Sequence, residues 1–356
     1  MVYLTGGPGQ GSHWGQSALE SKTHNLLLVN QRGISLSKPE RLDDFLNPNF
    51  YSSEFIAKDL EVLRKSLKVS KWSLYGVSYG TIPATIYASL FPESTRSLIL
   101  EGTGFSASQL SSFDIKKKII SEAILAQSTA VQKSIFQIST FAGINPSWLF
   151  QWARDTLLMN EGRQSLTTQL AALNDSTELQ KFIQHLTAQY TPQTGLPPND
   201  LFGLNEIPFY MISCQELGLN LPTTKTELQF QDGQIVEVRN PNTDQICKTL
   251  KATSQKNYLA SDYPVKVPVT YFQGQNDSAT EFPGAFQHFQ TVPLGQKQML
   301  LMSEGGHNPN LQILLSDSPE EQMILEKALI GELVPQDLLA KMNETEGPLQ
   351  WQLLKQ

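Results

Sequence analysis

Ser78 is the residue of this chain whose setting most directly indicates chemistry. It lies in Gly76-Val77-Ser78-Tyr79-Gly80, which follows an apolar run and precedes a stretch with helical spacing. On a sharp turn from a strand into a helix, this Gly-x-Ser-x-Gly pattern exposes the serine hydroxyl as a nucleophile. The helix N-terminus behind it favours developing negative charge. The alternative interpretation is an ordinary serine in a tight turn.

A serine hydroxyl needs a general base, and the chain has 5 histidines. Where such a serine turn lies in an α/β sheet, its partners follow in the order serine, acid, histidine. His307 fits that order, because it stands in a glycine loop directly after an apolar run. His13 follows another glycine loop and is a candidate for the wall of a pocket. His288 lies in an amphipathic stretch and fits a packing or surface position. His185 lies in the helical middle of the chain, and His24 just precedes a predicted strand.

The acid of such a triad orients the imidazole and stabilises its cation. Asp277 ends the segment YFQGQND, after the apolar run that precedes the one leading to His307. Glu101 ends a different apolar run and is the main alternative. Asp262 comes before its apolar run, at the opposite end of the predicted strand from Asp277. We therefore predict Asp277 as the acid.

The tetrahedral intermediate also needs two N–H donors for its oxyanion. Tyr79, the residue after the serine, supplies one. The second comes from Gly7 in the loop TGGPGQG at 5–11, where glycines allow the backbone to approach a ligand closely. This loop is not a P-loop, because no Gly-Lys-Ser/Thr follows. We predict a site that uses no metal and no cofactor.

These residues require a scaffold that brings the ends of strands together. Short apolar runs bounded by glycine or polar residues predict strands buried on both faces, as in a parallel sheet. Residues 53–68 have helical periodicity with one apolar face. Strands alternating with helices predict βαβ units. The predicted strands cover 2–6, 25–31, 71–77, 96–102, 267–274 and 298–305.

The middle of the chain has a different pattern. Residues 105–262 show mostly helical periodicity, and we predict a mainly helical cap inserted between two parts of one core, 1–104 and 263–356. Within this segment QFQDGQIVEVRNPNTDQ is either a small hairpin or a loop. Cys214 and Cys247 are too few for a disulfide scaffold and match no zinc spacing, so one disulfide and two buried thiols both remain open.

Composition excludes several classes of function. The net charge is −7 and no basic stripe is visible, which argues against a nucleic-acid partner. No apolar run approaches the roughly 20 residues of a membrane-spanning helix. With 40% apolar residues the chain can bury a sizeable core. The oligomeric state remains open.

Together the motifs resemble the α/β-hydrolase family of prolyl iminopeptidases and tripeptidyl aminopeptidases. GGPG at 6–9 is similar to the family's oxyanion loop, and NQRGISLS at 30–37 to its D-Q-R-G-x-G-x-S motif. Residues 76–102 are similar to its elbow, helix and next strand. GQND at 274–277 and GGH at 305–307 complete the triad. The resemblance covers both ends of the chain and only weakly the middle.

Two residues depart from that pattern. Asn30 stands where the family usually has Asp, and Ser35 where it has Gly. Arg32 is retained, although its partner carboxylate is then not obvious. We interpret this motif as structural, bracing the loops behind the site.

The resemblance implies an α/β-hydrolase fold and an exopeptidase that forms an acyl-enzyme from a peptide with a free N-terminus. Cap carboxylates would bind the α-ammonium, since a buried cation needs a counter-charge. Glu216, in SCQE, resembles the family's cap acid after a cysteine, and Glu206 is a second substrate-binding candidate. Phe209 and Tyr210 line a pocket or pack in the core. Two alternatives are a carboxylic ester hydrolase with the same triad and a non-catalytic or truncated relative.

The implied fold also bears on the N-terminus. Two strands would normally precede 2–6, and we expect them to be absent from this sequence. Residues 25–31 would then be an exposed edge strand prone to aggregation. The sequence leaves the compartment open, either cytoplasmic or secreted or periplasmic.

Overall fold

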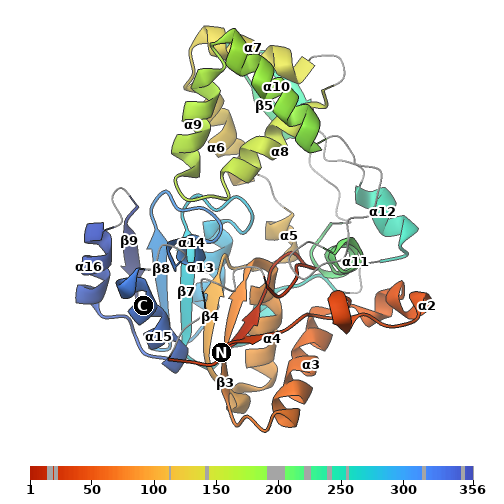
Figure 1. Ribbon diagram of the computed structural model, residues 1–356, viewed down its shortest axis with the longest axis vertical. Helices are drawn as coiled ribbons and strands as arrows, with labels where there is room; N and C mark the ends of the chain where they lie inside the picture. Colours follow the sequence, from red (N-terminus) through yellow and green to blue (C-terminus); the bar gives the residue numbers. More distant parts are fainter. Residues whose placement is uncertain are drawn as a thin grey trace.

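The computed structural model of the chain describes residues 1–13, 19, 23–111, 114–140, 144–190, 205–219, 226–238, 243–253, 256–314, 318–345 and 349–355. A sheet flanked by helices forms one part of the molecule, and a group of helices stands at one end of it (Figure 1). Both chain termini lie on the part that contains the sheet.

The central sheet has seven strands in the order β2-β1-β3-β4-β7-β8-β9. Neighbouring strands are parallel except for β9, which runs antiparallel to β8. This confirms the predicted mostly parallel sheet. The strands are β1 (Val2–Leu4), β2 (Leu27–Leu28), β3 (Trp72–Val77), β4 (Thr95–Glu101), β7 (Val269–Gly274), β8 (Lys297–Met302) and β9 (Trp351–Leu354).

The two ends of the sheet test the strand predictions. Among the described residues β2 pairs only with β1 and forms one edge, as expected for 25–31, but it is shorter than that segment. At the other edge β9 was not predicted. Its pairing with β8 brings Trp351 opposite Met302 and buries the indole, a long-range contact that local periodicity does not reveal.

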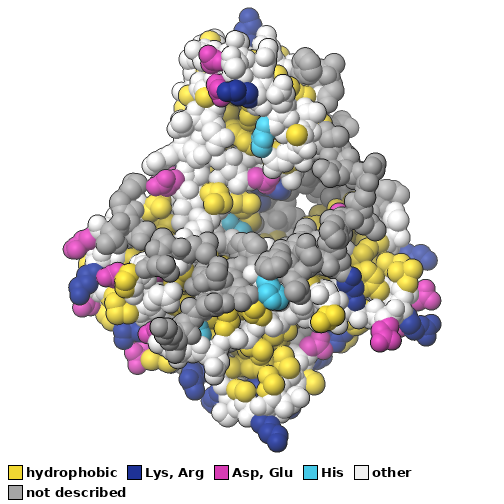
Figure 2. All heavy atoms as spheres, in the orientation of Figure 1, with side chains coloured by type: hydrophobic (Ala, Val, Ile, Leu, Met, Phe, Trp, Pro, Cys, Tyr) yellow, Lys and Arg dark blue, Asp and Glu magenta, His cyan; other side chains and the backbone are white. Residues whose placement is uncertain are grey.

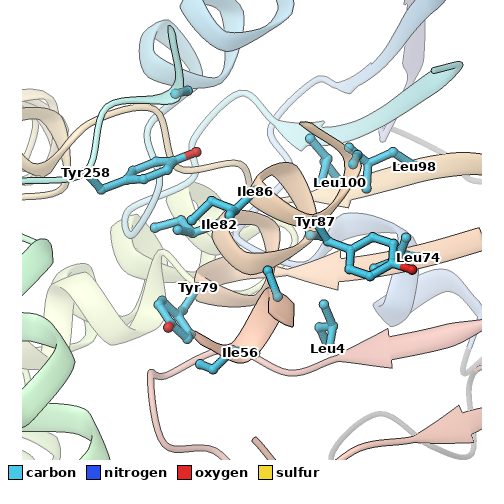
Figure 3. Packing of buried hydrophobic residues seen from close by; sticks show 14 of the residues in the cluster. Leu4, Ile56, Leu74, Tyr79, Ile82, Ile86, Tyr87, Leu98, Leu100 and Tyr258 are labelled. Carbon is cyan, nitrogen blue, oxygen red and sulfur yellow. The ribbon is translucent and has the colours of Figure 1, made fainter. Parts of the chain in front are cut away.

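Successive residues of a strand point to opposite faces of the sheet, and each face packs against its own apolar layer. In β3, Leu74 packs with helices α3 (Ser53–Ser66) and α4 (Thr81–Leu90), and Tyr75 packs with α15 (Pro319–Ile330) and α16 (Gln336–Thr345). Figure 3 shows the first layer, with Leu4 and Ile82 among its members. Ser52 caps α3, since its hydroxyl accepts a hydrogen bond from the Phe55 N–H at 3.0 Å. The packed strands thus fix where the loops at their ends begin.

The helical segment divides into two parts by its packing. Helices α6 to α10 and the hairpin β5–β6 share a core of their own, whereas α11 and α12 contribute to the layer beside α3 and α4. The segment QFQDGQIVEVRNPNTDQ, for which a hairpin and a loop were both open, includes the turn and the second strand of the antiparallel hairpin β5–β6. The elements are α5 (Ala107–Leu110), α6 (Asp114–Leu125), α7 (Thr129–Thr140), α8 (Pro146–Thr156), α9 (Gly162–Ala172), α10 (Ser176–Tyr190), α11 (Glu206–Glu216), β5 (Thr226–Gln229), β6 (Ile235–Val238) and α12 (Thr243–Thr249).

A disulfide joins the two helices that pack on the main core. Cys214 in α11 is bonded to Cys247 in α12. Of the two alternatives, one disulfide or two buried thiols, the structure therefore shows the disulfide. Two further helices, α13 (Phe282–Thr291) and α14 (Pro309–Leu314), follow β7 and β8. None of the described helices has the length and apolar content needed to cross a membrane. Basic side chains are scattered over the face shown in Figure 2 rather than gathered in a stripe.

Candidate active site

Ser78 lies on the turn between β3 and α4, in the left-handed region with φ 55°. The turn has no room for side chains at its two glycines. A Cβ on Gly80 would lie 2.1 Å from the Leu4 carbonyl oxygen, and one on Gly76 would lie 2.5 Å from the Gly80 carbonyl oxygen. The Gly-x-Ser-x-Gly spacing therefore has a steric cause, since only glycine permits this approach of β1 and α4. The strained φ is typical of a residue held for function.

The glycine loop that follows β1 lies directly against Ser78. A Cβ on Gly6 would be 2.8 Å from the Ser78 Cβ and 3.2 Å from its Oγ. The Thr5 hydroxyl donates to the Gln10 carbonyl at 2.8 Å and holds the loop closed. Gly7 has φ 105°, which a residue with a side chain rarely adopts. The structure thus places the predicted oxyanion loop beside the predicted nucleophile.

His307 and Asp277 lie together at the ends of β8 and β7. The His307 Nδ1 is 2.9 Å from Asp277 Oδ2 and 3.0 Å from Oδ1. The acid is fully buried at 0% exposure, and the imidazole keeps 10% of its side chain exposed. A carboxylate held against Nδ1 fixes the imidazole tautomer with Nε2 available to accept a proton. The structure thus brings these two predicted residues into contact.

Residues around Asp277 fix its orientation, and sequence reasoning missed them. Its Oδ1 accepts hydrogen bonds from the N–H groups of Ala279 and Thr280 at 2.7 and 2.8 Å. Its Oδ2 accepts from the Thr280 hydroxyl at 2.8 Å and from Gln273 Nε2 at 3.1 Å. An aspartate that bonds to N–H groups two and three residues ahead is a common turn, so the Asp-x-x-Thr spacing was a usable signal.

Glu101, the alternative acid, contacts other groups. One of its oxygens accepts from the Asn310 and Leu311 N–H groups at 2.7 and 3.0 Å, and the other from the Tyr75 hydroxyl at 2.6 Å. Burial raises the pKa of Glu101 to about 7. It therefore anchors the start of α14, the helix that follows His307, and makes no hydrogen bond to the imidazole.

The motif at 30–37 braces the glycine loop. Asn30 Oδ1 accepts from the Ser12 N–H at 3.1 Å, so an amide fills the place where the family usually has an acid. Arg32 forms an ion pair with Asp59 of α3, with Nε 2.6 Å from Oδ2. The carboxylate partner of Arg32 thus comes from a helix more than 20 residues further along the chain, where no local motif indicates it.

Comparison with known proteins decides the family. The family described as alpha/beta hydrolase fold matches residues 1–312. The chain belongs to the α/β-hydrolase family. The family match confirms the resemblance that the motifs indicated. In this fold Ser78, Asp277 and His307 follow β3, β7 and β8 in chain order.

Curated relatives match a shorter segment of this α/β hydrolase. A proline iminopeptidase of Aeromonas sobria is 34% identical over 119 residues, which cover 29% of this chain and 28% of that protein. One of Xylella fastidiosa (strain 9a5c) is 31% identical over 103 residues, 29% of this chain and 31% of that protein. One of Arabidopsis thaliana is 30% identical over 103 residues, which cover 29% of this chain and 26% of that protein. The chain thus matches less than a third of the length of each of these relatives.

Solved structures to which the chain is similar include VinJ and Est816. VinJ has a TM-score of 0.47 and 14% identity, covering 92% of this chain and 88% of the other. Est816, described as an N-acyl homoserine lactone degrading enzyme, has a TM-score of 0.46 and 13% identity, covering 91% of each chain.

The two glutamates predicted to bind substrate lie at opposite ends of α11. Glu206 is its first residue and Glu216 its last. At a rise of 1.5 Å per residue the two backbone positions are about 15 Å apart along the helix, so we treat the two glutamates as separate candidates. Asn205, next to Glu206, donates its N–H and its side-chain amide to the Gly9 carbonyl at 2.8 and 2.9 Å. The Glu206 end of α11 therefore abuts the glycine loop.

Glu216 is linked to the nucleophile turn through Ser53. Both of its oxygens lie 3.1 Å from the Ser53 N–H, and the Ser53 hydroxyl also donates to it. The Ser53 oxygen is 2.8 Å from the Tyr79 hydroxyl, and Tyr79 follows Ser78 in sequence. Burial raises the pKa of Glu216 to about 7. Sequence reasoning did not identify Ser53 as a partner of either residue.

Glu216 also lines a cavity of about 240 Å³. Glu54, Lys256, Tyr258 and Tyr263 are among the other lining residues, so the cavity combines two carboxylates and one ammonium group with aromatic walls. Ser78 is not among the described residues that line it.

The remaining candidates have other surroundings. His288 is buried, with Nε2 3.1 Å from the Thr85 hydroxyl and Nδ1 2.8 Å from the Tyr271 hydroxyl, so of the packing and surface positions left open for it the structure shows packing. Burial lowers the pKa of His288 to about 4. His13 Nδ1 lies 3.3 Å from the hydroxyl of its neighbour Ser12.

Proposed function

We propose that this protein is a serine hydrolase in which Ser78, His307 and Asp277 form the catalytic triad. The observation that carries the proposal is the left-handed backbone of Ser78 together with the closeness of the glycine loop. A Cβ placed on Gly6 of that loop would lie 3.2 Å from the Ser78 Oγ. A loop held that close has no room for a side chain, which is what an oxyanion site beside a nucleophile requires.

The reaction uses each group in turn. Ser78 Oγ adds to the substrate carbonyl carbon while its proton passes to His307 Nε2. The Gly7 and Tyr79 N–H groups donate to the resulting oxyanion. The leaving group departs with the proton from His307, and water then cleaves the acyl-enzyme with His307 acting again as base. Asp277 holds the imidazole in place throughout.

The proposed substrate is a peptide with a free N-terminus. The relatives named proline iminopeptidases support this class. We assign the α-ammonium to Glu216, because its carboxylate lines a cavity with tyrosine rings that can face a cation. The other charged lining residues, Glu54 and Lys256, are already paired with Lys58 and Asp262. Glu206 is the alternative contact, since its end of α11 abuts the glycine loop.

Covalent labelling tests the triad. A fluorophosphonate probe reacts with activated serines, so the wild-type protein should be labelled at Ser78 and Ser78→Ala should not be labelled. Ser66→Ala, an exposed serine at the end of α3, is the matched control and should be labelled as wild type. An unlabelled wild-type protein that is folded would overturn the proposal and favour a non-catalytic relative.

A substrate panel tests the aminopeptidase assignment. Aminoacyl and peptidyl arylamides with free N-termini should be cleaved, and their N-acetylated counterparts should not. Glu216→Gln should raise KM for the free substrates, whereas Glu206→Gln should leave it nearly unchanged. Equal cleavage of blocked and free peptides would overturn the assignment, and the opposite response of the two variants would transfer the role to Glu206.

One observation favours a second candidate, a carboxylic ester hydrolase with the same triad. Glu216 already accepts hydrogen bonds from Ser53, and a pKa of about 7 leaves it partly neutral at neutral pH, so it is a weak counter-charge. Short acyl esters distinguish the two functions. Faster cleavage of these esters than of any arylamide, with no effect of Glu216→Gln, would favour the esterase.

A further inference from the structure

The cap contacts the histidine loop through its backbone. The turn between α8 and α9, residues 157–161, is here called the cap turn and lies at the end of the helical group that faces the sheet (Figure 1). The His307 N–H donates to the Leu158 carbonyl at 2.8 Å. The Gly306 N–H donates to Asn160 Oδ1 at 3.1 Å. Two consecutive backbone amides of the histidine loop are therefore bonded to the cap turn.

The cap turn is bonded on its other side to the helix that follows the histidine. The Asn160 N–H donates to Gln312 Oε1 at 2.8 Å, and Gln312 Nε2 lies 3.4 Å from the Leu158 carbonyl. Gln312 belongs to α14. Asn160 thus bridges the residue before His307 and the helix after it, and the cap turn holds the loop from both directions.

The contact is close as well as hydrogen-bonded. A Cβ on Gly306 would lie 2.3 Å from the Leu158 carbonyl oxygen and 2.5 Å from that of Met159. The acid loop is attached to the same part of the cap, because the Ser278 hydroxyl donates to the Arg154 carbonyl at 2.9 Å. The end of α8 and the cap turn therefore contact both loops that carry the partners of Ser78.

We infer that Asn160 is a positioning residue for His307, acting through the Gly306 N–H, so that the cap turn sets the place of the imidazole. The inference rests on the proposed catalytic role of His307. A displacement of about 1 Å in a catalytic group can lower a rate about 100-fold. A cap that only covers the site would alter substrate binding, whereas a cap that places His307 alters the chemical step itself.

Three variants test this inference with a fluorophosphonate and with the best arylamide or ester of the panel. Asn160→Ala removes the acceptor for Gly306, and it should slow labelling of Ser78 and lower kcat by about 10- to 100-fold with KM within about twofold. Asn160→Asp keeps an acceptor oxygen and should restore both rates to within about threefold of wild type. Asn145→Ala is the matched control, because Asn145 caps α8 at its far end, and it should react as wild type.

Each outcome decides between the two proposals. Wild-type labelling and kcat in a folded Asn160→Ala protein would overturn the positioning role and leave the triad intact. Labelling of Ser78→Ala at the wild-type rate would instead overturn the triad. Should Asn160→Ala fail to fold, Gln312→Ala loosens the cap turn from its other side and should slow labelling about tenfold, with Gln312→Glu restoring it. Unchanged labelling in Gln312→Ala would then overturn the inference.

Discussion

The His307 Nδ1 lies within hydrogen-bonding distance of both carboxylate oxygens of Asp277, 2.9 and 3.0 Å away. Glu101 also ends a strand near this imidazole, but its oxygens accept from Tyr75 and from backbone N–H groups of α14. Two buried carboxylates thus have separate tasks: one contacts the ring and the other fixes the helix behind it.

This arrangement predicts unequal effects of two isosteric substitutions. Asp277→Asn should lower kcat by about 10⁴-fold, because an amide favours the wrong imidazole tautomer. Glu101→Gln keeps a carbonyl oxygen for the α14 N–H groups and should lower kcat less than about tenfold. Steady-state kinetics on purified, folded variants measure both effects. A larger loss in Glu101→Gln than in Asp277→Asn would reverse the assignment.

The raised pKa of Glu216 predicts how substrate binding depends on pH. Burial brings this pKa to about 7, so the carboxyl is neutral below that pH and cannot pair with an ammonium. The KM for free peptides should therefore fall as pH rises from 6 to about 7.5, below the range in which an α-ammonium, with a pKa of about 8, loses its own charge. Glu216→Gln should abolish this dependence and Glu206→Gln should keep it. A KM that does not change with pH in the wild type would contradict the assignment.

The close packing of the serine turn predicts a severe effect of a single methyl group. Gly80→Ala should lower the free energy of unfolding by more than about 3 kcal/mol, because its Cβ would lie 2.1 Å from a carbonyl oxygen of β1. Gly104→Ala is the control, since the nearest atoms to its Cβ would be leucine methyl groups at 3.4 Å and an isoleucine methyl group at 3.6 Å. Denaturant unfolding compares the two. Equal stability of the variants would show that the turn tolerates a side chain.

The disulfide predicts a dependence of stability on reduction. The two cysteines are 33 residues apart, and a cross-link over such a loop contributes about 3 to 4 kcal/mol by restricting the unfolded chain. A reductant should lower the denaturant midpoint of the wild type and leave Cys214→Ala/Cys247→Ala unchanged. Thiol titration of the unfolded, unreduced wild type should detect no free thiol. Two thiols in that assay would support the alternative of unpaired cysteines.

The sequence by itself determined the serine turn, the glycine loop and the order of Ser78, Asp277 and His307. These features are local. A strand buried on both faces must be apolar over consecutive residues, and the turns at its ends need glycine where backbones touch. The helix at 53–66 could be predicted for the same reason, since its apolar spacing and Ser52 cap depend only on near neighbours.

Only the tertiary structure decided which distant groups meet. The sequence does not specify the order of strands across a sheet, so Glu101 and Asp277 were both possible partners of His307. The order β4-β7-β8 puts the strand before Asp277 directly beside the strand before His307. Arg32 pairs with Asp59 across an interface with α3. Asn160 and Gly306 are 146 residues apart, and their contact depends on how the cap packs on the strand ends. Such contacts depend on the relative placement of whole helices and strands, which the local spacing of residues does not specify.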